Sequence, residues 1–272
     1  MKIFNQLSLK GETLSGQDIV FDLDGTLIEG DIGETLFYHT LLAGSICTTN
    51  DEKWFMPFSK LDSKIPIPIH GESAKMLFDY QTDLSGRAFE KAYTHTATWL
   101  ENYPREDIEL LIVRLLATNV QPVRIPCQAF INGKSQDIHI RYGVHVKVDM
   151  REMVRGFREK GARLWIVSAS PQMVCELVGE NFKIEPEHIL GVKVAANGRE
   201  ITRFPWGPSK VRVLREVGVT KPLLAFGDGE GDIEMLAIAK YPVVIENGST
   251  SLLKLASQKD WWFYAYHEKL VE

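Results

Sequence analysis

Two aspartates follow directly after a short apolar segment near the amino terminus. Ile19, Val20 and Phe21 precede Asp22, and Asp24 lies two positions further on. At this spacing both carboxylates lie on one side if the extended backbone continues. Two such charges about 4 Å apart repel by roughly 4 kcal/mol at an effective dielectric constant near 20. A hard divalent cation with oxygen ligands is the simplest group that would hold them, so the pair predicts a metal-assisted site.

A second polar segment follows a buried strand predicted over residues 163–167. The sequence there is Ser-Ala-Ser-Pro. We expect Ser170 to be the amino-terminal cap of a helix, with Pro171 at the first helical position. Ser168 is then left for a ligand, because a hydroxyl beside helix-terminal amides can bind an anion.

A third polar segment combines three acids with glycines after another apolar run. Asp228, Glu230 and Asp232 would repel a pyrophosphate, which excludes a dinucleotide fingerprint, and no Gly-Lys-Ser/Thr follows for a phosphate-binding loop. An EF-hand loop would need glycine where Ile233 stands. A carboxylate cluster at a strand end remains. Lys210 begins a nearby helix, where the dipole disfavours a cation, and this favours a role facing an anion or the acids.

The bulk properties limit the classes of protein. The chain has 272 residues, 44% of them hydrophobic and 25% charged, as in a globular protein with a sizeable core. A net charge of -5 gives no general attraction to nucleic acid or to an anionic membrane. We expect no membrane span and no secretion signal. Cys47, Cys127 and Cys175 form no Cys-x-x-Cys pair, which favours the cytoplasm.

The elements that must position these residues follow from periodicity. Helical spacing covers residues 29–42, 149–160 and, in pieces broken near 83–86 and 103–104, residues 73–117. Alternation predicts hairpins around Asn132-Gly133 and Asn197-Gly198. The aromatic tail at 261–266 predicts a final strand, whereas residues 44–71 show no regular pattern.

Two acids begin the helix at 29–42. Asp31 and Glu34 can cap that helix, or they can face a substrate above the aspartate pair. The aromatic side chains of residues 54–103 leave a similar choice, because they can form a core or line a pocket for a cationic group.

In order and type, these segments resemble the four motifs of the haloacid dehalogenase-like (HAD) phosphohydrolase superfamily. The motif residues are Asp22, Asp24 and Thr26; Ser168; Lys210; and Asp228 with Asp232. The resemblance implies an α/β fold with a Rossmann-like doubly wound parallel sheet over residues 1–30 and 146–272. It also implies a mostly helical inserted cap of the C1 type over residues 31–145.

Details within the motifs are similar to the phosphoserine phosphatase and phosphorylcholine phosphatase branch. They are the Ser-Ala-Ser turn, the hairpin before Lys210 and the Gly-Asp-Gly-x-Gly-Asp ending. One departure is Gly231, where phosphoserine phosphatases usually carry asparagine, and it weakens an assignment to serine phosphate.

The resemblance also implies a mechanism. Asp22 would attack phosphorus and form an aspartyl-phosphate, while Asp24 would act as general acid and then as general base. Asp22, the backbone carbonyl of Asp24, and Asp228 would bind Mg²⁺. Asp232 would hold a metal-bound water or Lys210.

The same resemblance assigns residues to the substrate. The groups that would hold the phosphoryl oxygens are Thr26, Ser168, the Ala169 amide and Lys210. Asp31 and Glu34 stand where the family places acids that bind a substrate amine. The expected partner is therefore a small phosphorylated substrate, with choline, ethanolamine or serine as leaving group.

The same residues also bear on alternative functions. Phosphotyrosine or a macromolecular substrate is an alternative, given the aromatic cap region. Dehalogenases lack an acid at the position of Asp24, and P-type ATPases carry threonine there, so both are disfavoured. An inactive binding module would be expected to have lost a motif residue, and none is lost. The expected state is a monomer or a homodimer.

Overall fold

The computed structural model describes residues 2–46, 65–118, 121–196, 200–246 and 248–265. The chain forms two compact units. The first unit comprises Met1–Ile28, Val146–Gly191 and Phe204–Glu272. The second unit comprises Glu29–His145 and Val192–Arg203.

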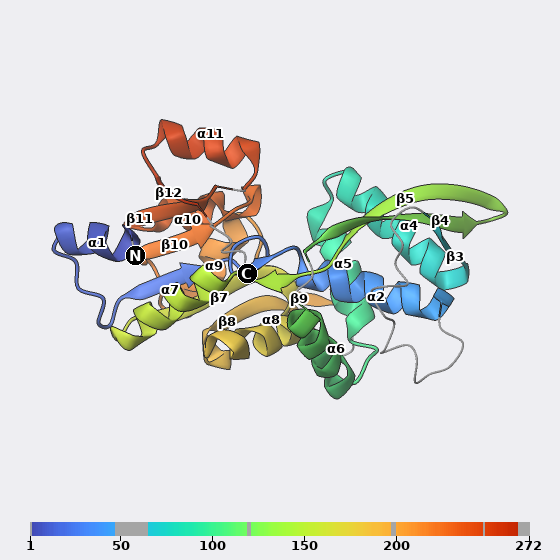
Figure 1. Ribbon diagram of the computed structural model, residues 1–272, viewed down its shortest axis with the longest axis horizontal. Helices are drawn as coiled ribbons and strands as arrows, with labels where there is room; N and C mark the ends of the chain where they lie inside the picture. Colours follow the sequence, from blue (N-terminus) through green and yellow to red (C-terminus); the bar gives the residue numbers. More distant parts are fainter. Residues whose placement is uncertain (1, 47–64, 119–120, 197–199, 247, 266–272) are drawn as a thin grey trace, which may run out of the picture. The chain divides into compact units, whose positions relative to one another are not determined.

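A seven-stranded sheet contains the strands that lead to the predicted motifs (Figure 1). Its order is β12 (Trp262–Tyr264), β11 (Tyr241–Ile245), β10 (Leu224–Gly227), β1 (Asp18–Phe21), β7 (Arg163–Pro171), β8 (Ile189–Val194) and β9 (Ile201–Arg203). The pairs β1–β7, β1–β10, β10–β11 and β11–β12 are parallel, and β8–β9 is antiparallel. The predicted α/β class with a parallel sheet is confirmed, as is the final strand.

The register of the central strands explains why the motif residues converge. Phe21 at the end of β1 pairs with Phe226 on β10 and with Ile166 on β7. These three side chains are fully buried, which matches strands covered on both faces. The residues that follow these positions lie toward the carboxyl ends of the three strands, the edge at which open parallel sheets bind ligands.

The first unit also contains six α-helices among the described residues. They are α1 (Lys2–Leu9), α7 (Val148–Glu159), α8 (Gln172–Gly179), α9 (Pro208–Glu216), α10 (Ile233–Ile238) and α11 (Thr250–Gln258), with short 3₁₀ turns at Glu180–Phe182, Pro186–His188 and Glu230–Asp232. The predicted helix at 149–160 is confirmed by α7, whose buried face contains Met150, Met153, Val154 and Phe157.

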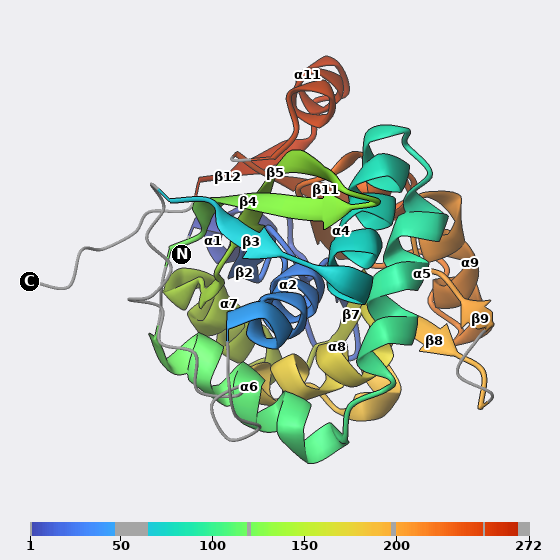
Figure 2. The ribbon, with the colours of Figure 1, turned by 90° about the vertical axis from the view of Figure 1, so that its right-hand side faces the viewer.

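The second unit combines helices with a small sheet (Figure 2). Its helices are α2 (Ile32–Ile46), α4 (Gly71–Ser85), α5 (Phe89–Leu100) and α6 (Arg105–Thr118), which confirms the predicted breaks. The sheet has the order β3 (Ile67–Ile69), β4 (Val123–Ile131), β5 (Lys134–Tyr142). Asn132 and Gly133 have φ angles of 51° and 75°, as a tight hairpin turn requires.

One expectation meets a different outcome, because β7 continues through Pro171 rather than ending at residue 167. The segment 44–71, whose sequence shows no regular pattern, contributes β3. A further short pair joins β2 (Ile28–Glu29) and β6 (His145–Val146). The Asn197-Gly198 turn, the side chain of Cys47 and the aromatics of residues 54–58 lie outside the described residues.

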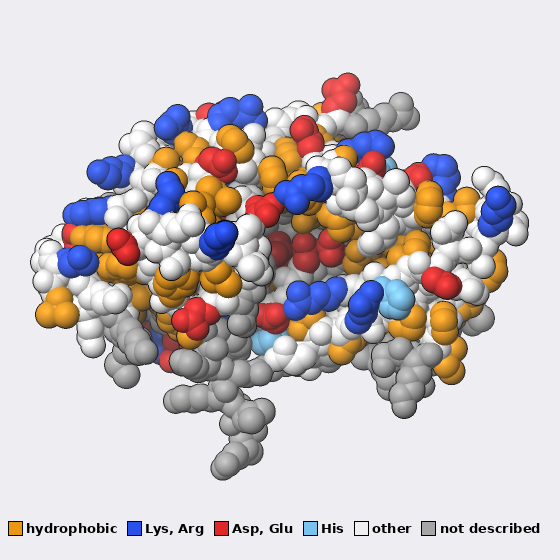
Figure 3. Space-filling view, turned by 90° about the horizontal axis from the view of Figure 1, so that it is seen from above, with side chains coloured by type: hydrophobic (Ala, Val, Ile, Leu, Met, Phe, Trp, Pro, Cys, Tyr) orange, Lys and Arg blue, Asp and Glu red, His pale blue; other side chains and the backbone are white. Residues whose placement is uncertain are grey.

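The surface carries mixed charges. On the face shown in Figure 3, lysine and arginine side chains lie among aspartates and glutamates instead of forming one basic patch. This mixture agrees with the small net charge of -5. Among the described residues, no helix combines the length and the apolarity needed to cross a membrane.

Phe157 is a large aromatic residue in the core of the first unit. Its ring is fully buried, and it lies 4.7 Å from the ring of Phe4 and 6.1 Å from that of Phe226. We expect Phe157→Ala to lower the free energy of unfolding by about 3–5 kcal/mol, because a cavity remains. Urea unfolding followed by circular dichroism would measure this.

The matched control on the same helix is Arg155→Ala, whose side chain is exposed. It should change stability by less than about 0.5 kcal/mol. Equal effects of the two substitutions would contradict the packing role of Phe157.

Candidate active site

A buried lysine joins the ends of three different segments. Lys210 lies in the first turn of α9 and is 2% exposed. Its Nζ donates to Asp22 Oδ1 at 2.6 Å, to Asp232 Oδ1 at 2.7 Å and to the Val167 carbonyl at 2.7 Å. An ammonium group has three protons, so these acceptors use all of them. The unusual cation at a helix amino terminus is therefore explained by two carboxylates.

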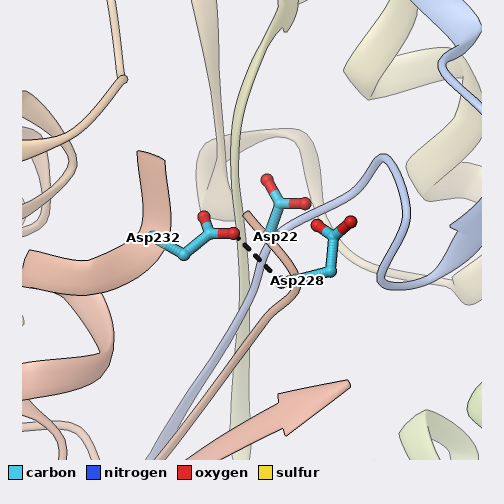
Figure 4. Close-up of side chains that lie close together, drawn as sticks. All are labelled: Asp22, Asp228 and Asp232. Atoms are coloured by element: carbon cyan, nitrogen blue, oxygen red, sulfur yellow. Dashed lines mark hydrogen bonds between the residues drawn. The ribbon is translucent and has the colours of Figure 1, made fainter. Parts of the chain in front are cut away.

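Asp228 and Asp232 complete the acidic side of the site (Figure 4). One carboxylate oxygen each from Asp22, Asp228 and Asp232 lie within 4.8 Å of one another. The other oxygen of Asp232, Oδ2, accepts the amides of Asp228 and Gly229 at 3.1 and 2.9 Å. Protein donors thus bind both carboxylate oxygens of Asp232. Asp22 and Asp228 are therefore better placed than Asp232 to bind a cation through a carboxylate oxygen.

The electrostatics of the cluster are dominated by burial and like charge. Burial, followed by repulsion from Asp232, raises the pKa of Asp22 to about 7, although Lys210 opposes this shift. Burial and the charges of Asp22 and Asp232 also raise the pKa of Asp228. Burial lowers the pKa of Lys210, but the same two carboxylates outweigh it, and the net shift is upward. The single positive charge of Lys210 does not neutralise the negative charges of Asp22, Asp228 and Asp232.

Asp24 is held by two serines on β7. Ser168 Oγ donates to Asp24 Oδ2 at 3.2 Å, and Ser170 Oγ donates to the same oxygen at 2.7 Å. The expected helix cap at Ser170 is wrong, because α8 begins at Gln172 and the strand runs past the serine. Ala169 lies between the two serines on this strand. Ser170 is therefore a residue of the site that local helix-start patterns hide.

In the turn after Asp24, the backbone of Gly25 lies very close to the Asp228 side chain. Gly25 has a φ of +77°, and a β-carbon there would overlap Asp228 Oδ2, so only glycine fits this position. Thr26 is fully buried, and its hydroxyl has no hydrogen-bond partner within the described residues. A buried hydroxyl without a partner is costly, so Thr26 is ready to meet a polar group of a ligand.

Lys147 is a second buried cation that the sequence reasoning missed. It is fully buried, its Nζ donates to the Gly25 carbonyl, and its charge lowers the pKa of Asp228. It precedes α7 and belongs to no motif. The alternation at residues 144–148 places Lys147 at a polar position, so the sequence pattern predicts exposure and gives no sign of its burial.

The donor set fits a hard divalent cation. Asp22, Asp228 and Asp232 bring carboxylate oxygens together, and burial with mutual repulsion raises the pKa of Asp22 and Asp228. A divalent cation would stabilise the ionised form of these carboxylates. Clustered carboxylate oxygens are also the ligands that Mg²⁺ and Ca²⁺ prefer.

The departure at Gly231 has a steric cause. A β-carbon on Gly231 would lie 2.7 Å from Nε1 and 2.9 Å from Cδ1 of Trp206. The Gly207 amide also donates to the Gly231 carbonyl at 2.9 Å. The indole thus occupies the space that an asparagine side chain would need.

Asp31 and Glu34 belong to the second unit. Asp31 Oδ1 accepts the Glu34 amide at 2.7 Å, which confirms the capping interpretation for Asp31. Glu34 accepts a hydrogen bond from the hydroxyl of Tyr80. Tyr80 and Phe37 are fully buried and pack with ring centroids 5.2 Å apart, so these aromatics are core.

Comparisons with known proteins agree with this arrangement. The sequence model of the haloacid dehalogenase-like hydrolase family matches residues 19–237. No curated protein sequence matches the chain.

Three solved structures are similar at 11–16% identity, which shows the fold alone. A protein of unknown function from Bordetella pertussis Tohama I is 16% identical, with a TM-score of 0.61 over 93% of this chain and 100% of that one. A HAD family hydrolase from Salmonella enterica subsp. enterica serovar Typhi is 14% identical, with a TM-score of 0.57 over 98% and 76%. A probable phosphoserine phosphatase from Vibrio cholerae is 11% identical, with a TM-score of 0.52 over 93% and 62%.

The pKa of Asp22 predicts how metal-free stability depends on pH. The folded-state pKa of about 7 exceeds the ordinary value of 3.8. Between these values the folded chain holds a proton that the unfolded chain has lost, so stability falls as pH rises. In EDTA, the stability of Asp22→Asn relative to the parent chain should therefore increase from about pH 5 to about pH 8.

Urea unfolding of both proteins across this range would measure the difference, in which the titration of groups distant from Asp22 cancels and that of Asp228 changes with the loss of the Asp22 charge. A constant difference, or one with the opposite slope, would show that Asp22 is already ionised at low pH in the folded chain.

Proposed function

The chain belongs to the haloacid dehalogenase-like hydrolase family, and we propose that it is a phosphatase that hydrolyses a phosphate monoester through an aspartyl-phosphate at Asp22. The observation that carries this proposal is the buried Lys210 ammonium, which holds Asp22 beside the other acids. A carboxylate fixed in this way at a strand end is placed for in-line attack. The names of the similar structures add support, since one is a probable phosphoserine phosphatase.

The proposed reaction uses two carboxyl groups in turn. A carboxylate oxygen of Asp22 attacks phosphorus, and the electron pair of the broken P–O bond passes to the leaving oxygen. Asp24 gives that oxygen its proton, so an alcohol departs and Asp24 becomes a carboxylate. The same carboxylate then takes a proton from the water that hydrolyses the acyl phosphate.

The phosphoryl oxygens would be held by groups already on the protein. These are the hydroxyls of Thr26 and Ser168, the Ala169 amide and the Lys210 ammonium, which would act through its charge because its three protons go to protein acceptors. Their positive or donor character opposes the charge that moves onto the phosphoryl group and the leaving oxygen.

Mg²⁺ is the proposed cofactor. The ligands would be Asp22, Asp228 and the backbone carbonyl of Asp24, with Asp232 holding Lys210 or a metal-bound water. When bound, the ion would neutralise the phosphate and the carboxylates together.

We propose that the second unit is a cap that excludes water and selects the leaving group. Asp31 and Glu34 supply its negative charge, and a small amino alcohol such as choline, ethanolamine or serine would complement them. The free buried thiols Cys127 and Cys175 agree with a cytoplasmic location.

Phosphate release tests the proposed function. We expect turnover of at least one monoester in a panel of phosphocholine, phosphoethanolamine, phosphoserine, phosphotyrosine and sugar phosphates. EDTA should abolish it and Mg²⁺ should restore it. Asp22→Asn should lower kcat by at least about 10³-fold, because the nucleophile is lost.

The matched control is Asp79→Asn on α4, a partly exposed acid that pairs with Lys75 across one helical turn. It should keep full activity. If the parent chain released no more phosphate than Asp22→Asn on every substrate, the proposed reaction would be wrong.

A second prediction addresses the leaving group. Glu34→Gln removes a charge but keeps an oxygen that can accept from Tyr80. We expect KM for phosphocholine or phosphoethanolamine to rise about tenfold, equivalent to about 1.4 kcal/mol, while KM for p-nitrophenyl phosphate changes less than about twofold. Steady-state kinetics on both substrates would measure this.

Glu109→Gln, an exposed charge change on α6, serves as the control. An equal rise in KM for the uncharged leaving group would mean that Glu34 does not bind an amine.

A further inference from the structure

Ser170 is a residue of the site to which the motifs assign no role in the reaction. It is 2% exposed, and its hydroxyl makes the shorter of the two hydrogen bonds to Asp24 Oδ2, 2.7 Å against 3.2 Å for Ser168. A distance of 2.7 Å is that of a well-formed hydrogen bond between a hydroxyl and an oxygen acceptor, so the contact fixes the direction of this oxygen. The contact therefore concerns the carboxyl group that the proposed reaction uses twice.

The two serines are coupled through the backbone. Ser168 Oγ accepts the Ser170 amide at 3.0 Å, so its own proton is directed to Asp24. Ser168 is also the hydroxyl proposed to bind a phosphoryl oxygen. Once Ser168 donates to a substrate, Ser170 is the remaining serine that donates to Asp24.

The backbone around Ser170 leaves it little freedom to move. Its carbonyl accepts the Cys175 thiol at 3.4 Å. A β-carbon on Gly191, in the neighbouring strand β8, would lie 2.9 Å from that same carbonyl oxygen. Close packing on both sides fixes the position from which the hydroxyl donates.

We propose that Ser170 is a positioning residue, which holds Asp24 so that Oδ2 accepts from the serine and Oδ1 carries the proton to the leaving oxygen. This inference rests on the proposed phosphatase function. In the step concerned, Asp22 forms the new bond to phosphorus, and the old P–O bond breaks toward the leaving oxygen. Asp24 Oδ1 then loses its proton to that oxygen.

The role of Ser170 should depend on how much the leaving group needs a proton. An alkoxide is a poor leaving group and requires general-acid catalysis, whereas 2,4-dinitrophenolate leaves without a proton. The quantity to compare is kcat/KM, because it reports the steps up to formation of the aspartyl-phosphate and not its later hydrolysis.

The experiment measures kcat/KM of Ser170→Ala and of the parent chain with Mg²⁺. The substrates are the best alkyl phosphate of the panel and 2,4-dinitrophenyl phosphate. We expect a loss of about 10- to 100-fold on the alkyl phosphate, part of the 10²–10⁴-fold that general acids contribute. On the dinitrophenyl ester the loss should stay below about threefold. Asp24→Asn should show the same selectivity with a larger loss.

Two further variants separate positioning from packing. Ser170→Thr keeps the hydroxyl and should restore most of the activity on the alkyl phosphate, whereas Ser170→Cys, similar in size but a weak donor, should not. They also provide the comparison if Ser170→Ala folds poorly. Ser85→Ala, on an exposed serine of α4, is the control for removal of a hydroxyl.

Equal losses on both esters, no loss on either, or full activity of Ser170→Cys on the alkyl phosphate would overturn the proposal. Failure of the proposed function is a separate result, because it would appear as an inactive parent chain on all substrates.

Discussion

A buried ammonium group holds the ends of three segments in one place. Lys210 gives its three protons to Asp22 after β1, to the Val167 carbonyl on β7 and to Asp232 before α10. Loss of one partner from such a buried pair costs about 3–5 kcal/mol, because a charge remains without compensation. The same three hydrogen bonds of Lys210 therefore fix both the position of the proposed nucleophile and the arrangement of the strand ends. The remaining negative charge gives the same site its affinity for a cation.

The sequence was informative wherever the constraint was local and repeated. Parallel strands must end at one edge, so acids after separate apolar runs could be expected to meet, and Asp22 lies with Asp228 and Asp232. The hairpin at Asn132-Gly133 was predictable because its turn requires positive φ angles. The cap at Asp31 was predictable for a similar reason, since one side chain satisfies one helix-terminal amide.

Residues whose role depends on a distant partner could not be found in this way. Ser170 before Pro171 looks like a helix start, yet strand β7 continues beyond Ile166, where its pairing with β1 ends, and the Ser170 hydroxyl reaches Asp24. Buried Lys147 donates to the Gly25 carbonyl, and its charge lowers the pKa of Asp228. Both partners are distant in the sequence, so the residues around Lys147 do not predict these interactions. Strand β3 contains Pro68, which lowers local strand propensity but leaves tertiary pairing possible.

The contact between Trp206 and Gly231 constrains how such a site could diverge. An asparagine can enter position 231 only after the indole has withdrawn, because its β-carbon would already lie within 3 Å of the ring. The residue at 206 therefore sets which side chains position 231 can accept: with a smaller side chain at 206, position 231 could accept residues other than glycine.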